Sequence, residues 1–147
     1  MLIKLQKKGT YLPVKNTITV YDRDMDNVKY KESLFGETQK KEKYTVSAKI
    51  INEIKEMIAK RDSLFSIKEL KGADDILDGD TWKLIIEKYG ITHKLKAYSP
   101  WAVDENHNSH TKDELIDIQL FVSMFEEIEN ILIEAGCRFE EEDDNEE

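Results

Sequence analysis

Four aspartates crowd into one stretch of the sequence, where the neighbouring glycines predict turns. They are Asp74, Asp75, Asp78 and Asp80. Glu69 and Lys71 precede them, and a Glu-x-Lys pair beside strand-borne acids is typical of metal-dependent nucleases. Here the acids follow the pair and lie in a turn, which argues against that chemistry. We therefore expect the aspartates to contact a basic partner, with a solvated acidic loop as the alternative.

Two histidines and a carboxylate form a second pattern. His107 and His110, with Asp104, could surround a zinc ion with two imidazoles and one carboxylate. The predicted loop has no helical scaffold to fix them, so we interpret them as surface residues and keep this metal set as an alternative. No cofactor is expected, because no glycine-rich loop for phosphates is present.

Three further patterns fail as reactive sites. Alternate aspartates from Asp22 to Asp26 copy half of a calcium-binding loop, but Asn27 stands where that loop needs glycine. Cys137 follows the end of a predicted helix, where the helix dipole disfavours a thiolate. His93 falls on the apolar face of a predicted hairpin, which indicates a core histidine. No catalytic residue is predicted.

Aromatic residues mark the start of a polar loop. Tyr98 and Trp101 flank Pro100, and exposed Tyr and Trp side chains are typical anchors at protein interfaces. Packing as a cap over the core is the alternative. We predict that both side chains join the four aspartates in binding a partner.

The strongest structural pattern is a long helix over 112–135. Thr111 and Glu114 have the spacing of a capping box at its start. Apolar residues then recur at helical spacing, and Gly136 stands where a helix commonly ends. Such a helix needs a broad apolar surface to pack against.

The remaining pattern predicts that surface to be a sheet. Residues 1–32 alternate as strands, 81–98 reads as a hairpin, and 47–61 reads as a second helix. The polar stretch 32–43 is predicted to be a loop. These elements predict an α+β fold, with a mainly antiparallel sheet and both helices on one face.

Charge and length limit the function further. The chain of 147 residues has a net charge of −9, divided into +5 for residues 1–60 and −14 for the remainder. We expect one domain over 1–139 and a disordered acidic tail over 140–147. The acidity disfavours direct nucleic-acid binding, and no apolar run has the length of a membrane span. One cysteine and no recognisable signal segment suggest the cytoplasm.

The run from Asp78 to Trp82, Asp-Gly-Asp-Thr-Trp, resembles an Asp-Gly-x-x-Trp entry to a hairpin found in small uncharacterised bacterial α+β proteins. The resemblance covers 77–100 and implies a helix packed behind the hairpin. It brings no functional residues with it. In size and acidity the chain is also similar to immunity proteins and phage-encoded inhibitors.

These observations favour a non-enzymatic protein that binds and blocks a macromolecular partner. The expected partner is a protein with a basic surface, which the acidic half of the chain would attract. Two alternatives stay open: a metal-dependent hydrolase of nuclease type, and a small-ligand binding module with a pocket between sheet and helix.

Overall fold

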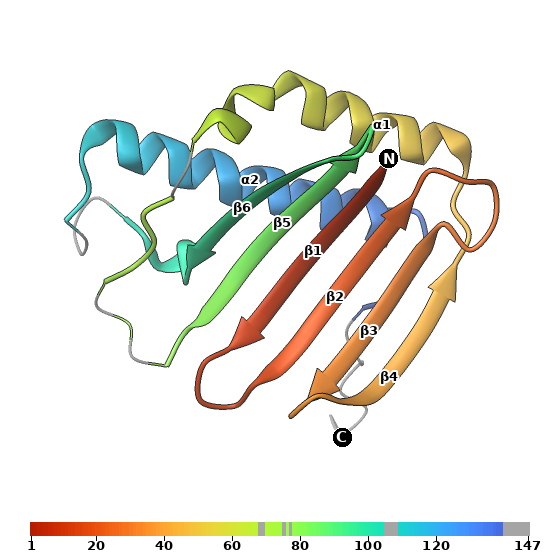
Figure 1. Cartoon of the computed structure of the whole chain (residues 1–147), viewed down its shortest axis with the longest axis horizontal. Helices are drawn as coiled ribbons and strands as arrows, with labels where there is room; N and C mark the ends of the chain where they lie inside the picture. Colours follow the sequence, from red (N-terminus) through yellow and green to blue (C-terminus); the bar gives the residue numbers. More distant parts are fainter. Residues whose placement is uncertain (68–69, 75, 77, 105–108, 140–147) are drawn as a thin grey trace.

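A six-stranded antiparallel sheet forms the centre of the computed structural model, which describes residues 1–67, 70–74, 76, 78–104 and 109–139. The strand order across the sheet is β4-β3-β2-β1-β5-β6 (Figure 1). The strands are β1 (Leu2–Gly9), β2 (Val14–Tyr21), β3 (Val28–Leu34), β4 (Glu37–Tyr44), β5 (Asp80–Lys88) and β6 (Ile91–Tyr98). The first strand is central because it pairs with both β2 and β5.

Two helices, α1 (Ala48–Lys60) and α2 (Lys112–Glu134), lie on one face of this sheet, behind it in Figure 1. Two short 3₁₀ turns, η1 (Asp62–Ser66) and η2 (Pro100–Ala102), follow α1 and β6. The predicted α+β fold is confirmed, including the antiparallel sheet and the long C-terminal helix. No helix in the described part of the chain combines the length and the apolar character needed to cross a bilayer.

The start of α2 follows the predicted capping box. The Thr111 hydroxyl accepts the Glu114 N–H at 3.1 Å, and the Glu114 carboxylate accepts the Thr111 N–H at 2.8 Å. These bonds satisfy two backbone donors that the first turn leaves without helical partners. Gly136 adopts a φ of +105° just past the helix end, a conformation that side chains disfavour. Both ends of α2 are therefore set by local sequence.

The core lies between the helices and the facing side of the sheet. Phe121 and Phe125 of α2 are fully buried, and the Phe125 ring lies 4.7 Å from that of Trp82 on β5. From α1, Ile54 is completely buried. Burying aromatic and branched side chains of this size gives roughly 1.5–3 kcal/mol each. The helix layer is thus held to the sheet by apolar contact. Because both helices lie on this side, the described helices do not cover the opposite face of the sheet.

The prediction of a loop over 32–43 is wrong. The chain turns tightly at Phe35 and Gly36 and returns as β4, an edge strand that pairs with β3. All eight residues of β4 are exposed or half-buried. The strand therefore lacks the alternation of apolar and polar residues from which a strand is predicted. Charged residues are common on edge strands, where they oppose pairing with other chains.

The prediction that His93 is a core histidine is also wrong. It is exposed near the start of β6, the other edge strand, and its ring lies 5.9 Å from that of Phe65. Only Leu95 and Ala97 of β6 are buried. Alternation identified the correct face, but the helices do not cover this end of the strand.

Candidate functional site

The face of the sheet turned away from the helices is lined with lysines. Side chains alternate along a strand, and directly paired residues share a face. Because Leu5 and Leu84 point into the core, their neighbours Lys4 and Lys83 point the other way. The pairing register places ten lysines on this face: Lys4, Lys8, Lys15, Lys29, Lys31, Lys41, Lys43, Lys83, Lys94 and Lys96. We call these ten residues the lysine face.

Lysines oppose one another directly across neighbouring strands. The paired residues are Lys8 with Lys15, Lys29 with Lys43, Lys31 with Lys41, and Lys83 with Lys96. Like charges directly opposite on one face destabilise a sheet by up to about 1 kcal/mol each. The strand positions on this face, all within the described residues, contain one acid, Glu87. The lysine face therefore concentrates positive charge at a cost to the fold.

The pKa of Lys83 is affected by the neighbouring lysines. Its side chain is half-buried, and its pKa is lowered from the usual range. Desolvation is the main cause, and repulsion from Lys94, Lys96, Lys15 and Lys8 adds to it in that order. Lys94 and Lys96 lie on β6, Lys8 lies on β1, and Lys15 lies on β2. The charges thus act together across the sheet.

A shallow depression of about 850 Å³ lies over β1 to β4 on this face. Thr17, Thr19 and Ser33 contribute hydroxyl groups to it between the lysines. The Tyr21 ring borders the depression, with the Arg23 guanidinium 4.3 Å and the Lys29 ammonium 5.3 Å from the ring centre. Glu42 also lines the depression, but six lysines outnumber it, so this surface offers mainly cations and hydroxyl groups to an anionic partner.

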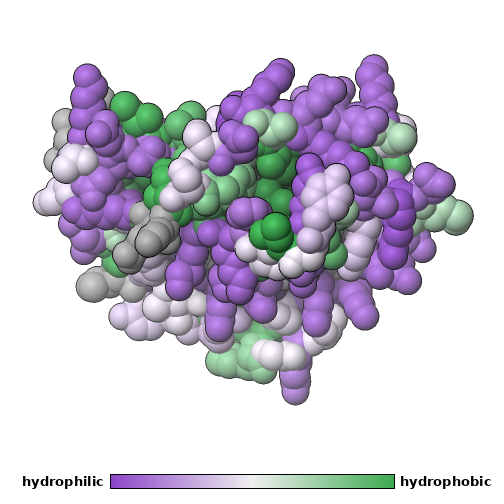
Figure 2. Space-filling view, turned by 45° about the horizontal axis from the view of Figure 1, so that its top comes forward, coloured by the Kyte–Doolittle hydropathy of each residue, from purple (hydrophilic) through white to green (hydrophobic). Residues whose placement is uncertain are grey.

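The helix layer has the opposite charge. The acids of α2 outnumber its one lysine and comprise Asp113, Glu114, Asp117, Glu126, Glu127, Glu129 and Glu134. Two of them pair with cations of other elements, Glu129 with Lys7 at 3.3 Å and Glu127 with Arg61 at 2.9 Å. Figure 2 shows hydrophilic side chains over much of the molecule. The net charge of −9 thus conceals a separation of charge between the two layers.

The predicted partner-binding residues gather partly at one end of β5 and β6. The Asp80 carboxylate accepts the indole N–H of Trp82 at 2.9 Å and that of Trp101 at 2.6 Å. The Tyr98 hydroxyl donates to Ile76 O at 2.9 Å and accepts the Gly79 N–H at 3.0 Å. These groups therefore hold the segment before β5 against the end of β6.

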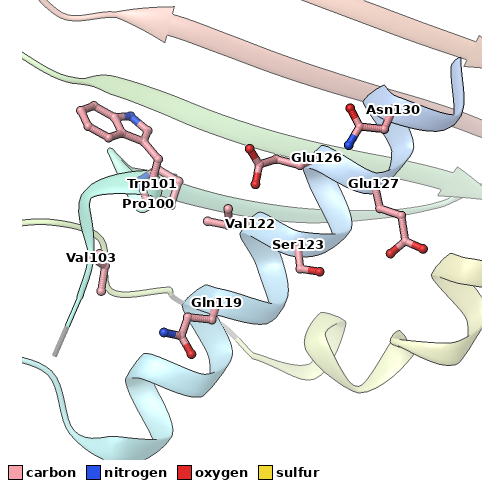
Figure 3. A pocket seen from close by; sticks show the side chains of 9 residues that line it. All are labelled: Pro100, Trp101, Val103, Gln119, Val122, Ser123, Glu126, Glu127 and Asn130. Carbon is pink, nitrogen blue, oxygen red and sulfur yellow. The ribbon is translucent and has the colours of Figure 1, made fainter. Parts of the chain in front are cut away.

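The other predicted residues of this set differ in accessibility. Asp74 and Asp78 are exposed, and Asp75 lies outside the described residues. Trp101 has 54% of its surface exposed despite its bond to Asp80. It lies in η2 beside a groove of about 520 Å³ against α2, where Figure 3 shows it on the segment that also carries Pro100 and Val103. Its partner-binding role stays a prediction.

The alternative metal set is only partly described, since His107 lies outside the described residues. His110 forms a 2.8 Å hydrogen bond through Nε2 with the backbone oxygen of Lys71, and Asp104 is half-buried. Within the residues that the structure describes, no three His, Cys, Asp or Glu side chains gather closely enough to hold a metal ion.

The sequence did not predict the burial of three polar residues, Thr19, Asn27 and Ser99, and Asn27 is only 1% exposed. Its amide donates to Val46 O at 2.8 Å and to Arg23 O at 3.0 Å, and its carbonyl accepts the Val46 N–H at 2.8 Å. These bonds tie the β2–β3 turn to the segment before α1. Nothing local in the sequence distinguishes this asparagine from a solvated one.

Comparison of the sequence with protein-family models gives no match, and comparison with curated proteins gives none either.

Proposed function

We propose that this protein is a non-enzymatic binding protein that blocks a macromolecular partner, and that it binds the partner through the lysine face. The observation that carries the proposal is the set of directly opposed lysine pairs. Repulsion between them costs stability that an arrangement with mixed charges would avoid. An acidic partner relieves that repulsion and is steered toward the face by its field.

The partner proposed from the sequence was a protein with a basic surface, facing Asp74, Asp75, Asp78 and Asp80. The geometry favours another surface and the opposite charge for the contact. The Asp80 carboxylate already accepts hydrogen bonds from two indole groups. In contrast, five residues of the lysine face are exposed: Lys31, Lys41, Lys43, Lys94 and Lys96. We therefore assign the partner an acidic surface.

The dimensions of the face suit a protein partner. Five strand spacings of about 4.8 Å give a width of about 24 Å, and eight residues give a length of about 27 Å. That area, about 650 Å², approaches the roughly 800 Å² that each partner buries in a standard protein interface.

The residue types also favour protein over nucleic acid. Sheets that bind single strands stack bases on aromatic rings, and arginine is the usual bidentate ligand of phosphate. The six strands contain no arginine, and the aromatic residues that line the depression are Tyr21 and Tyr30, of which Tyr30 is only 3% exposed. The acidic helix layer would in addition repel a long polyanion that extends past the face.

Affinity capture from nuclease-treated lysate of the native cells tests the proposal. Three baits are compared: the natural chain, a face variant with Lys31→Glu and Lys96→Glu, and a control with Lys49→Glu and Lys60→Glu on α1. All four lysines are exposed, and both variants change the net charge equally.

We expect an acidic protein on the natural chain and the control, released by salt and missing from the face variant. Equal capture by all three baits would show that the lysine face is not the contact. Material that is captured from untreated lysate but lost after nuclease treatment would assign the face to nucleic acid.

A further inference from the structure

We propose that the acidic segment 140–147 binds the lysine face of its own chain and occupies it until the acidic partner displaces it. The binding itself depends only on features of this chain. Its regulatory consequence rests on the function proposed above.

Charge complementarity is the first support. Seven of the eight residues in 140–147 are acidic. The lysine face has ten lysines and one acid on its strand positions. The helix layer is less suited to this segment, because α1 and α2 together carry nine acids against four lysines.

The second support is the position where the described chain leads into the segment. Phe139 is 7% exposed, and its ring lies 5.4 Å from that of Tyr30 on β3 and 6.0 Å from that of Tyr44 on β4. The Tyr44 hydroxyl donates to the backbone oxygen of Arg138. The chain is thus fixed beside the outer edge strand of the sheet, on the helix side.

The third support is reach. Eight extended residues span at most about 26–29 Å. Rounding the edge of β4 takes about 10 Å, the distance between packed sheet layers, which leaves about 16–19 Å across the open face. At about 4.8 Å per strand, that distance covers β4, β3, β2 and the approach to β1. The lysines within reach are Lys15, Lys29, Lys31, Lys41 and Lys43.

The physical consequence is competition within one molecule. A tethered segment has an effective concentration in the millimolar range, so even weak binding fills the site for much of the time. We expect neutralisation of the seven acids to raise partner affinity about threefold to tenfold at low salt, and by less at high salt.

Paramagnetic broadening in the full chain tests the docking without any partner. A nitroxide is attached through Asn145→Cys at neutral pH, where burial keeps Cys137 unreactive because its pKa is raised to about 11. We expect broadened backbone amides at Lys31, Lys43 and Lys15 at low salt. The broadening should disappear at about 1 M salt, where the Debye length is about 3 Å.

The matched control carries the same nitroxide in a chain whose seven acids are changed to glutamine or asparagine. Broadening that is equal in both chains, or that falls on α1 and α2, would overturn the proposal. A mixture of spin-labelled chain with isotope-labelled, nitroxide-free chain shows whether the broadening comes from the same molecule or from a second copy. Broadening in that mixture would assign the contact to a second copy and also overturn it.

The two proposals fail in different ways. Broadening of the face that depends on the seven acids establishes docking, whatever protein is or is not captured. Capture of an acidic protein through the face establishes the function, whether or not broadening occurs.

Discussion

Replacing Lys43 and Lys96 with glutamine should stabilise the fold. Lys43 directly opposes Lys29, and Lys96 directly opposes Lys83, so each change removes one repulsive pair while keeping a side chain of similar length. Both residues are exposed and leave the core untouched. The experiment uses the chain with its seven acids at 140–147 neutralised, so that the segment cannot offset the repulsion.

The magnitude follows from the pairing. Removing one opposed pair should raise the free energy of unfolding by about 0.2–1 kcal/mol. The double variant should therefore be more stable by about 0.5–2 kcal/mol at low salt. For a domain of this size, each kcal/mol raises the melting temperature by about 2–4 °C. Raising the salt to about 1 M shortens the Debye length to about 3 Å and should remove most of the gain.

Urea unfolding at low and high salt measures this free energy. The control is Lys49→Gln with Lys60→Gln on α1, which changes the net charge equally and should stay within about 0.5 kcal/mol of the parent. A face variant no more stable than this control at low salt would show that the opposed lysines do not destabilise the sheet. A gain that is unchanged at high salt would show that charge repulsion is not its cause.

Four further predictions concern single residues. Asn27→Ala should lower the free energy of unfolding by about 2–4 kcal/mol in urea unfolding, because it leaves buried backbone groups unpaired. Asp80→Asn should destabilise the fold by about 1–2 kcal/mol in the same assay, because the Asp80 carboxylate accepts hydrogen bonds from two indole N–H groups. Partner capture should be unchanged, because Asp80 lies outside the lysine face. The Cys137 thiol, whose pKa burial raises to about 11, should react with a thiol reagent at pH 8 only after unfolding. The hydrogen bond from the Thr111 N–H is the main cause that lowers the pKa of Glu114 from its usual value of 4.5. The ionised carboxylate therefore stabilises the fold fully above pH 4.5, and this stabilisation is lost as the pH falls through the lower pKa of the folded state. Glu114→Gln should accordingly flatten the acid side of a plot of stability against pH.

Local patterns were sufficient for the parts of the fold that depend on local interactions. The 112–135 helix was predictable because its cap, its apolar stripe and its terminal glycine lie in one continuous segment, and the structure has Lys112–Glu134. The 81–98 hairpin was predictable for a similar reason, since Trp82, Leu84 and Ile86 alternate toward the core.

The lysine face depends on strand pairing and was therefore missed. Its signal was present as lysines two residues apart, as in Lys29 with Lys31 and Lys94 with Lys96. Their shared face became evident only once β1 was placed between β2 and β5, and once the charged run of β4 was recognised as a strand. Sequence reasoning instead weighted the acidic half of the chain, because the aspartates from Asp74 to Asp80 are adjacent in sequence.

Zero-length carbodiimide cross-linking of the captured complex shows which surface binds the partner, because it joins lysines to carboxylates that are in contact. We expect cross-links from Lys4, Lys31 or Lys94 to acidic residues of the partner. Links from Asp74 or Asp78 to partner lysines, with none from the lysine face, would contradict this expectation and restore the acidic loop as the contact.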